Sequence, residues 1–258
     1  MSNKIIDVDQ GHWLLSKMGK KVLRPGGKEL TIKLIEALNI TSEDNVIEFA
    51  PGIGFTALYV LKKQPASYTG IELNEEAAQN LRRKINGVGR KIILGNASNI
   101  SLENASADKI YGEAMLTMHA DHRKSEIIKE AHRLLKKGGL YGVHELSLTP
   151  DTLDEKTKAE IQRGLAQNIK VNARPLTQSE WIHLIEKEVF RVKKIITNPM
   201  RLLEAGRIID DEGFFHSLKI GFNIITHPRA RKRIREMRCI FKKNSNHINA
   251  IAIIAEKI

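Results

Sequence analysis

Two glycines, Gly52 and Gly54, stand where the backbone can lie directly against a small ligand. They follow residues 46–49, a short apolar run typical of a buried strand, and precede residues 57–61, whose apolar side chains suit a helix. A strand that passes through a tight glycine turn into a helix N-terminus is a binding site for small ligands. Glycine lacks a Cβ and tolerates positive φ, so this turn allows a close approach.

A carboxylate follows the glycine turn at an informative distance. Residues 68–73 form a second strand-like run, and Glu72 lies 18 residues after Gly54. A carboxylate at this position can accept hydrogen bonds from both hydroxyls of a ribose. The Gly-x-Gly sequence alone is weak evidence, because many turns contain two glycines. Together with Glu72 it predicts a nucleoside site.

The order of these motifs resembles that of the class I S-adenosylmethionine (SAM)-dependent methyltransferases. The resemblance covers residues 40–148 and is carried by Glu48-x-x-x-Gly52-x-Gly54, Glu72, Gly95-Asn96-Ala97, residues 108–113 and residues 134–140. A nicotinamide-binding Rossmann unit is the nearest alternative, because Gly52-x-Gly54-x-x-Ala57 also fits its fingerprint. The acid inside the first strand, Glu48, and the Lys-Gly-Gly turn at 137–139 favour the methyltransferases.

The resemblance implies SAM as the cofactor and S-adenosyl-L-homocysteine as the product. It places Gly52 and Gly54 beside the methionine part, Glu72 on the ribose, and Glu48 behind the loop. The predicted cofactor-binding residues are Glu48, Ala50, Gly52, Gly54, Glu72, Leu73, Asn96, Ala97, Gly112 and Glu113. Asn96 departs from the family, which often has an acid there to meet the adenine amine. Its amide oxygen can still accept that hydrogen bond, but without charge.

Strands and helices alternate along residues 28–148, which predicts a doubly wound α/β fold with a parallel sheet. A helix is predicted over 121–137, ended by Lys136-Lys137-Gly138, with the fifth strand over 139–148. Strands over 189–197 and 248–257 would complete a Rossmann-like, mostly parallel, seven-stranded sheet with an antiparallel last strand, as in the family.

Three regions are expected along the chain. Residues 1–27 form an N-terminal lid segment, in which Trp13 or His12 can reach the site. Residues 28–149 form the SAM-binding core. Residues 150–258 hold the rest of the sheet, interrupted by two insertions, 150–176 and 198–247, that we name the helical cap. The second insertion is too long for a plain hairpin, so the cap is expected to shape a substrate pocket.

Methyl transfer from a sulfonium needs alignment and exclusion of water more than acid–base chemistry. The expected reaction is a direct displacement, for which proximity can supply ~7–11 kcal/mol. Possible proton acceptors near predicted strand ends are Glu113, His119, His144 and Glu145, and the first three are the candidate catalytic residues. Whether a general base is used stays open at this point. Residues 115–118 could add an apolar substrate wall.

The sequence narrows the methyl acceptor by what it lacks. Enzymes that methylate a base amine resemble one another in an Asn/Asp-Pro-Pro-aromatic stretch, whereas residues 111–114 here read Tyr-Gly-Glu-Ala. The single cysteine, Cys239, argues against cytosine C5 chemistry, arsenite methylation, a disulfide and a cysteine-rich zinc site. A small-molecule acceptor remains, as in the ubiquinone/menaquinone-type branch, and no metal is expected.

Composition leaves two alternatives open. The chain has 258 residues, 41% hydrophobic and 28% charged, with no signal-peptide core or membrane-spanning run, so a cytoplasmic protein is expected. Its net charge of +12 is concentrated in a basic helix predicted from residue 228. An RNA or DNA methyltransferase using that helix is the first alternative, although a solvated face is favoured. A SAM-binding protein without turnover is the second. The oligomeric state is open.

Overall fold

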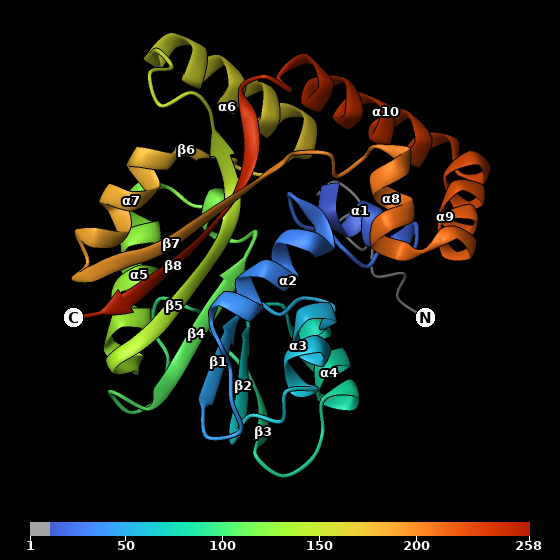
Figure 1. Cartoon of the computed structure of the whole chain (residues 1–258). Helices are drawn as coiled ribbons and strands as arrows, with labels where there is room; N and C mark the ends of the chain where they lie inside the picture. Colours follow the sequence, from blue (N-terminus) through green and yellow to red (C-terminus); the bar gives the residue numbers. More distant parts are fainter. Residues whose placement is uncertain (1–10) are drawn as a thin grey trace.

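The computed structural model describes residues 11–258, with only the backbone of His12. One sheet runs through the molecule in the strand order β3-β2-β1-β4-β5-β8-β7 (Figure 1). The strands are β1 (Asn45–Phe49), β2 (Ser67–Glu72), β3 (Arg90–Leu94), β4 (Ala107–Glu113), β5 (Leu135–Leu148), β6 (Leu176–Thr177), β7 (Phe190–Pro199) and β8 (Ile248–Lys257). Strands β1 to β5 are parallel, and β8 is antiparallel to both of its neighbours. The predicted fold class is confirmed; the two-residue β6, which pairs with β5, was not predicted.

Helices cover both faces of the sheet (Figure 1). One face packs against α5 (Asp121–Leu134) and α7 (Gln178–Glu186). The other packs against α2 (Gly27–Ala37), α3 (Phe55–Leu61) and α4 (Glu75–Lys84). Successive strand residues alternate between these cores: Ile47 joins the first and Val46 the second. Because both faces are buried, the strands read as continuous apolar runs.

The remaining helices gather beyond the ends of β4 and β5 (Figure 1). They are α1 (Gly11–Lys17), α6 (Glu155–Ile169), α8 (Ala205–Glu212), α9 (Phe214–Thr226) and α10 (Pro228–Lys243). A short 3₁₀ helix, η1 (Leu116–Met118), follows β4 in the chain. A separate apolar cluster joins α1 to α10 through Leu14, Met18 and Met237. A buried ion pair, Lys20 with Asp211 at 3.5 Å, fastens α8 to the chain after α1. Residues 11–27 therefore pack with the predicted cap.

The end of α5 differs from the prediction. The helix stops at Leu134, three residues early, and β5 begins at Leu135, which pairs with Ala107. The Lys136 ammonium lies 2.8 Å from the Asp108 carboxylate. The pairing register then shifts before Leu140, at an irregularity within β5 in which Gly138 has φ 76°. Sheet pairing thus takes the Lys-Lys-Gly residues that, by sequence, suit a helix C-terminus.

Two predicted helix starts are confirmed. The Asn74 side chain accepts a hydrogen bond from the backbone N–H of Ala77, at the N-terminus of α4. Thr177 and Glu180 form a reciprocal capping box at the start of α7. Over residues 11–258, no helix has both the length and the apolar content needed to cross a membrane.

Candidate functional site

A cleft of about 970 Å³ lies at the carboxyl ends of β1, β2, β3 and β4. Its lining includes Trp13, Lys21, Leu23, Arg24, Glu48, Ala50, Gly52, Ile53, Glu72, Leu73, Asn96, Ala97, Glu113, Met118, His119 and Val171. Parallel α/β sheets bind ligands at this end, where the strand order reverses. Eight of the ten predicted cofactor-binding residues border the cleft. The other two, Gly54 and Gly112, do not line it, although each is close in sequence to a residue that does.

The two glycines of the turn have different physical roles. Gly52 has φ 57°, and a Cβ placed on it would meet no atom nearer than 3.9 Å. Gly54 has φ 84°, and its Cβ would lie 2.8 Å from Cδ2 of Leu81 in α4. Gly52 therefore leaves space at the cleft wall for a ligand, whereas Gly54 lets α3 and α4 approach each other.

Glu72 ties the glycine turn to the end of β2. Its Oε2 accepts a hydrogen bond from the backbone N–H of Gly52 at 2.9 Å, and its Oε1 accepts one from Asn74 at 2.9 Å. A carboxylate has about four lone-pair positions, so each oxygen can still accept a hydrogen bond from a ligand hydroxyl. The side chain is almost fully buried yet borders the cleft.

Of the residues predicted to contact an adenine base, only some have side chains that are free to do so. Leu73 is 69% exposed at the rim and offers an apolar surface to a base. The Oδ1 of Asn96 already accepts hydrogen bonds from N and Oγ of Ser98, both at 3.1 Å. Its use as an acceptor for an adenine amine, which the sequence had suggested, is therefore disfavoured by this geometry.

Two alanines beside the cleft hold a strained backbone conformation. Ala50, just after β1, and Ala114, just after β4, both have φ 53°. Each is held by a backbone hydrogen bond to the next strand, from Ala50 to the Ile71 carbonyl at 2.8 Å and from Ala114 to the His144 carbonyl at 2.7 Å. Left-handed non-glycine residues cost energy and cluster at functional sites, which supports a binding role for this edge.

Glu48 is a buried acid that joins three strands. Its Oε2 accepts hydrogen bonds from the hydroxyls of Tyr68 at 2.5 Å and Tyr111 at 2.7 Å. Burial raises the pKa of Glu48 to about 7, against the lowering effect of the two tyrosine hydroxyls. A position at the bottom of the cleft agrees with the predicted role behind the glycine loop.

Glu113 is the centre of a buried polar network. Its Oε2 accepts hydrogen bonds from Nη1 of Arg24 at 2.6 Å and Oγ1 of Thr56 at 2.5 Å. Its Oε1 accepts from Oγ1 of Thr31 at 2.6 Å and lies 2.7 Å from Nδ1 of His144. The donors come from the chain before α2, from α2, from α3 and from β5. The network therefore fastens the N-terminal segment and two helices to the end of β4.

The protonation of this network follows from its partners. Nδ1 of His144 faces the Glu113 carboxylate, and Nε2 faces the Pro25 carbonyl at 2.5 Å. Both ring nitrogens of His144 are thus engaged with buried oxygen atoms. Burial alone would raise the pKa of Glu113, but the charge of Arg24 and the hydrogen bond from His144 lower it to about 2. We infer a positioning role for this pair, because both carboxylate oxygens and both ring nitrogens already have partners within the protein.

His119 is differently placed. It follows η1 and borders the cleft. Burial lowers its pKa below 6.5, and the charges of Arg123 and Lys124 lower it further. Among the residues that the structure describes, no hydrogen bond to its ring is seen. Of the three candidate catalytic residues, His119 is thus the neutral imidazole with an available nitrogen.

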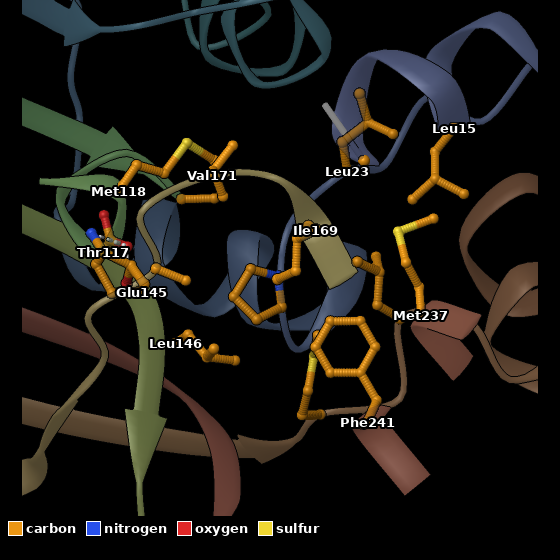
Figure 2. A pocket seen from close by; sticks show the side chains of 16 residues that line it. Leu15, Leu23, Thr117, Met118, Glu145, Leu146, Ile169, Val171, Met237 and Phe241 are labelled. Carbon is orange, nitrogen blue, oxygen red and sulfur yellow. Dashed lines mark hydrogen bonds between the residues drawn. The ribbon is translucent and has the colours of Figure 1, made fainter. Parts of the chain in front are cut away.

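A second cavity, of about 80 Å³, adjoins the cleft (Figure 2). Four residues line both spaces: Leu23, Ala114, Met118 and Val171. The rest of the lining is mainly apolar and comes from α1, α6, α10 and β5, with Leu15, Leu146, Ile169, Met237 and Phe241 converging on it. We name this space the apolar chamber.

The polar side chains that line the apolar chamber, Glu145 and Thr117, form hydrogen bonds within the protein. Glu145 accepts hydrogen bonds from the backbone N–H groups of Met115, Leu116 and Thr117, between 2.7 and 3.1 Å. It also accepts one from Oγ1 of Thr117 at 2.7 Å. Burial raises the pKa of Glu145, and these hydrogen bonds oppose the rise. Glu145 thereby holds η1 in place and leaves the chamber wall apolar.

Several contributors were not predicted. Arg24 and Thr31 carried no sequence signal for a contact with Glu113, which is 89 residues after Arg24. Met200 and Leu202 of the cap line the apolar chamber. Trp13 borders the cleft, whereas the side chain of His12 lies outside the described residues. In that described part, no cluster of three or more His, Cys, Asp or Glu side chains could hold a metal ion.

Comparison with known proteins agrees with the methyltransferase resemblance of the core. Residues 46–139 match the family model described as "Methyltransferase domain". The chain is 32% identical, over 251 residues, to an uncharacterized protein of Haemophilus influenzae, covering 96% of this chain and 98% of that one. It is 32% identical, over 147 residues, to phthiotriol/phenolphthiotriol dimycocerosates methyltransferase 1 of Mycobacterium ulcerans, covering 51% of this chain and 52% of that protein.

A likeness among solved structures extends over the whole fold. The [4+2]-cyclase SpnF superposes with a TM-score of 0.73, covering 97% of this chain and 93% of that chain at 15% sequence identity. At this identity the likeness concerns the fold alone, cap included.

Proposed function

Because the chain belongs to the class I SAM-dependent methyltransferases, we propose that it methylates an apolar small molecule held in the apolar chamber. The observation that carries the proposal is the shared wall: Leu23, Ala114, Met118 and Val171 separate the large polar cleft from the small apolar chamber. Two reactants bound in adjoining spaces can meet with their reacting atoms in contact, as displacement requires.

The shape of the cleft and the groups that line it suit SAM. The space beyond Gly52, where a Cβ would meet no atom nearer than 3.9 Å, leaves room beside the turn. Glu72 can accept the ribose hydroxyls, and Leu73 offers an apolar rim to the adenine. When bound, SAM would supply the electrophilic methyl group. Gly54, Gly112 and Glu48 would support this cradle from behind.

The residues of this chain contribute alignment and a dry site. Arg24 and His144 bind the Glu113 carboxylate, and His144 also binds the Pro25 carbonyl. These contacts hold residues 23–25 as part of the wall between the two spaces. Neutral His119 can accept the proton of an acceptor hydroxyl or amine. For a carbon or thiolate nucleophile this step is not needed.

The acceptor class follows from the chamber. Residues 11–27, 150–176 and 198–247 all contribute apolar side chains, among them Leu15, Ile169 and Phe241. This supports a helical cap that encloses the acceptor, with the Rossmann-like core at 28–149. The Mycobacterium ulcerans relative is named for a dimycocerosate, and an apolar acceptor fits both observations. A quinone precursor with an apolar tail, as in the ubiquinone/menaquinone-type branch, is one member of this class.

A second candidate is a SAM-binding protein that does not transfer the methyl group. It is favoured by the buried state of Glu113 and His144, which leaves His119 as the one predicted acceptor with an available nitrogen among the described residues. The fold also occurs in a protein named as a cyclase. A nucleic-acid acceptor is a third candidate and rests on the basic face of α10.

One assay separates these candidates. The protein is incubated with methyl-labelled SAM and, separately, with an organic-solvent extract of cells, a water-soluble metabolite extract and total RNA. The proposal predicts label in the organic extract, with loss of transfer in a Glu72→Ala variant. Label in RNA supports the nucleic-acid alternative. SAM binding without transfer to any fraction supports the second candidate.

A further inference from the structure

An unusual stripe of apolar side chains lies on the outside of α9. It consists of Phe214, Phe215, Leu218, Phe222 and Ile225, each more than half exposed. With 3.6 residues per turn, these five positions fall within an arc of about 100° on the helix. Single exposed apolar residues need no explanation, but a grouped patch of large ones marks an interaction surface.

The opposite side of α9 explains why this stripe faces outward. Ile220 is buried, His216 binds the Gly19 carbonyl at 2.9 Å, and Asn223 donates to the Met18 carbonyl at 3.0 Å. These contacts fix the rotation of α9 on the N-terminal segment. The apolar stripe is therefore presented by a helix that is already packed on its other face.

The next helix, α10, presents charge. Its buried positions, Ala230, Ile234 and Met237, form one side of the helix. Its exposed positions include Arg229, Arg231, Lys232, Arg235, Arg238, Lys242 and Lys243. The single acid of the helix is Glu236, whose Oε2 lies 3.5 Å from Nη1 of Arg233. Helices α9 and α10 are consecutive and lie at the outer edge of the molecule, away from the sheet (Figure 1).

The same region borders the apolar chamber. Met237 and Phe241, on the inner side of α10, line the chamber (Figure 2). A wall of the chamber is thus formed by a helix whose outer face is cationic and whose neighbour exposes a row of phenylalanines. Apolar molecules of low water solubility reside mainly in membranes.

We propose that α9 and α10 dock the enzyme on the surface of an anionic lipid membrane. The exposed apolar residues of α9 would enter the interface between headgroups and acyl chains, while the basic residues of α10 bind the headgroups. Apolar side chains combined with Lys and Arg are the features by which interfacial helices bind lipid, and basic clusters select anionic lipids. The acceptor would then reach the chamber from the membrane.

The two features together favour a membrane over other partners. Binding to nucleic acid uses phosphate contacts and leaves the three phenylalanines of α9 without a role. A protein partner or a second copy of the chain could cover the apolar stripe, but neither calls for seven exposed cations on the adjoining helix. Lipid headgroups and acyl chains satisfy both faces at once.

The test is a vesicle sedimentation assay with the full chain and no SAM, so that its outcome is independent of methyl transfer. Vesicles contain either an equal mixture of phosphatidylglycerol and phosphatidylcholine, or phosphatidylcholine alone. The variants are F215S/F222S on α9 and R231Q/R235Q/R238Q on α10. A matched control, K62Q/R83Q/K91Q, removes three exposed charges distant from the cap. Circular dichroism checks that each variant is folded.

The proposal predicts binding to the mixed vesicles that falls with added salt and is weak for phosphatidylcholine alone. Each basic residue near an anionic surface contributes about 1 kcal/mol, or about fivefold in partitioning. The triple arginine variant should therefore bind about 100-fold more weakly, the phenylalanine variant should also bind weakly, and the control should bind normally. Absence of vesicle binding overturns the proposal. So does RNA binding, or a dimer dissociated by F215S/F222S, in place of vesicle binding.

Discussion

Nδ1 of His144 lies 2.7 Å from Oε1 of Glu113 in the interior of the protein, and this contact turns two predicted proton acceptors into a structural pair. The carboxylate is shared with the Arg24 guanidinium at 2.6 Å. One carboxylate thus joins the Arg24 guanidinium, from the segment before α2, to the His144 ring of β5. The stability of the wall between cleft and chamber depends on the charge of Glu113.

Glu113→Gln should destabilise the fold by about 3–5 kcal/mol, because it leaves the buried Arg24 guanidinium without its carboxylate. The folded-state pKa of about 2 lies below the ordinary value of 4.5. The stabilisation from Glu113 is therefore complete above about pH 4.5 and is lost as the pH falls toward 2. Urea unfolding of wild type and variant at several pH values should show a difference that shrinks in this window.

Glu126→Gln is the matched control for that variant. Glu126 pairs with Arg123 on the exposed side of α5, where an ion pair contributes at most about 1 kcal/mol. A Glu113→Gln protein as stable as the control, at every pH, would show that Arg24 and His144 do not depend on this carboxylate.

The two glycines of the turn should respond differently to alanine. Gly54→Ala places a Cβ 2.8 Å from Leu81, so the main loss should be in stability, by about 1–3 kcal/mol. Gly52→Ala meets no protein atom nearer than 3.9 Å. Its φ of 57° costs an L residue about 1–2 kcal/mol, so a loss of SAM affinity should appear beyond this modest loss of stability. Thermal unfolding and calorimetry measure the two effects. The reverse pattern would remove Gly52 from the cofactor site.

The sequence was sufficient for the elements of the core because each is specified locally. The turn at Gly52, the helix start at Asn74 and the boundaries of α10 all depend on residues within a few positions of one another. The predicted end of α5 was wrong for a related reason. Leu135 pairs with Ala107 of β4, and no local pattern reveals that a neighbouring strand will compete with the helix for this residue.

The candidate site could be predicted only in part. Most residues of the family motifs border the cleft, but the hydrogen bonds and protonation of their side chains depend on partners that are distant in sequence. Arg24 lies in the predicted N-terminal lid segment, where it carried no sign of a contact with Glu113, and His144 was identified without its two partners, Glu113 and Pro25. Burial and protonation arise from tertiary contacts, so a candidate base and a buried ion pair look alike in sequence.

Filling the apolar chamber should impair acceptor binding without affecting SAM. Ala173 is buried on the chamber wall, and Ala173→Leu adds three carbons to a space of about 80 Å³. The KM for the acceptor should rise about tenfold or activity be lost, while the Kd for SAM changes little. Ala205→Leu, at an exposed site on α8, is the control. Unchanged acceptor kinetics would place the acceptor elsewhere.

His119→Gln should lower kcat by about 10²-fold if the acceptor loses a proton to this ring. Because burial lowers the pKa of His119 below 6.5, the ring is neutral at pH 7. The wild-type rate should be constant near neutral pH and fall only below 6.5, and this acidic limb should vanish in the variant. An identical pH profile in both proteins would show that no proton is transferred to His119.

The most direct measurement is calorimetric titration of S-adenosylhomocysteine into wild type, Glu72→Ala and Glu75→Ala. Glu72 borders the cleft, while Glu75, three residues later, accepts a hydrogen bond from Gln79 on the outer face of α4. Glu72→Ala should weaken binding by ~1.5–3 kcal/mol, the value of hydrogen bonds to a charged group, with Glu75→Ala equal to wild type. No heat from the wild type at millimolar ligand, or equal affinities in all three proteins, would contradict a SAM site at the end of β2.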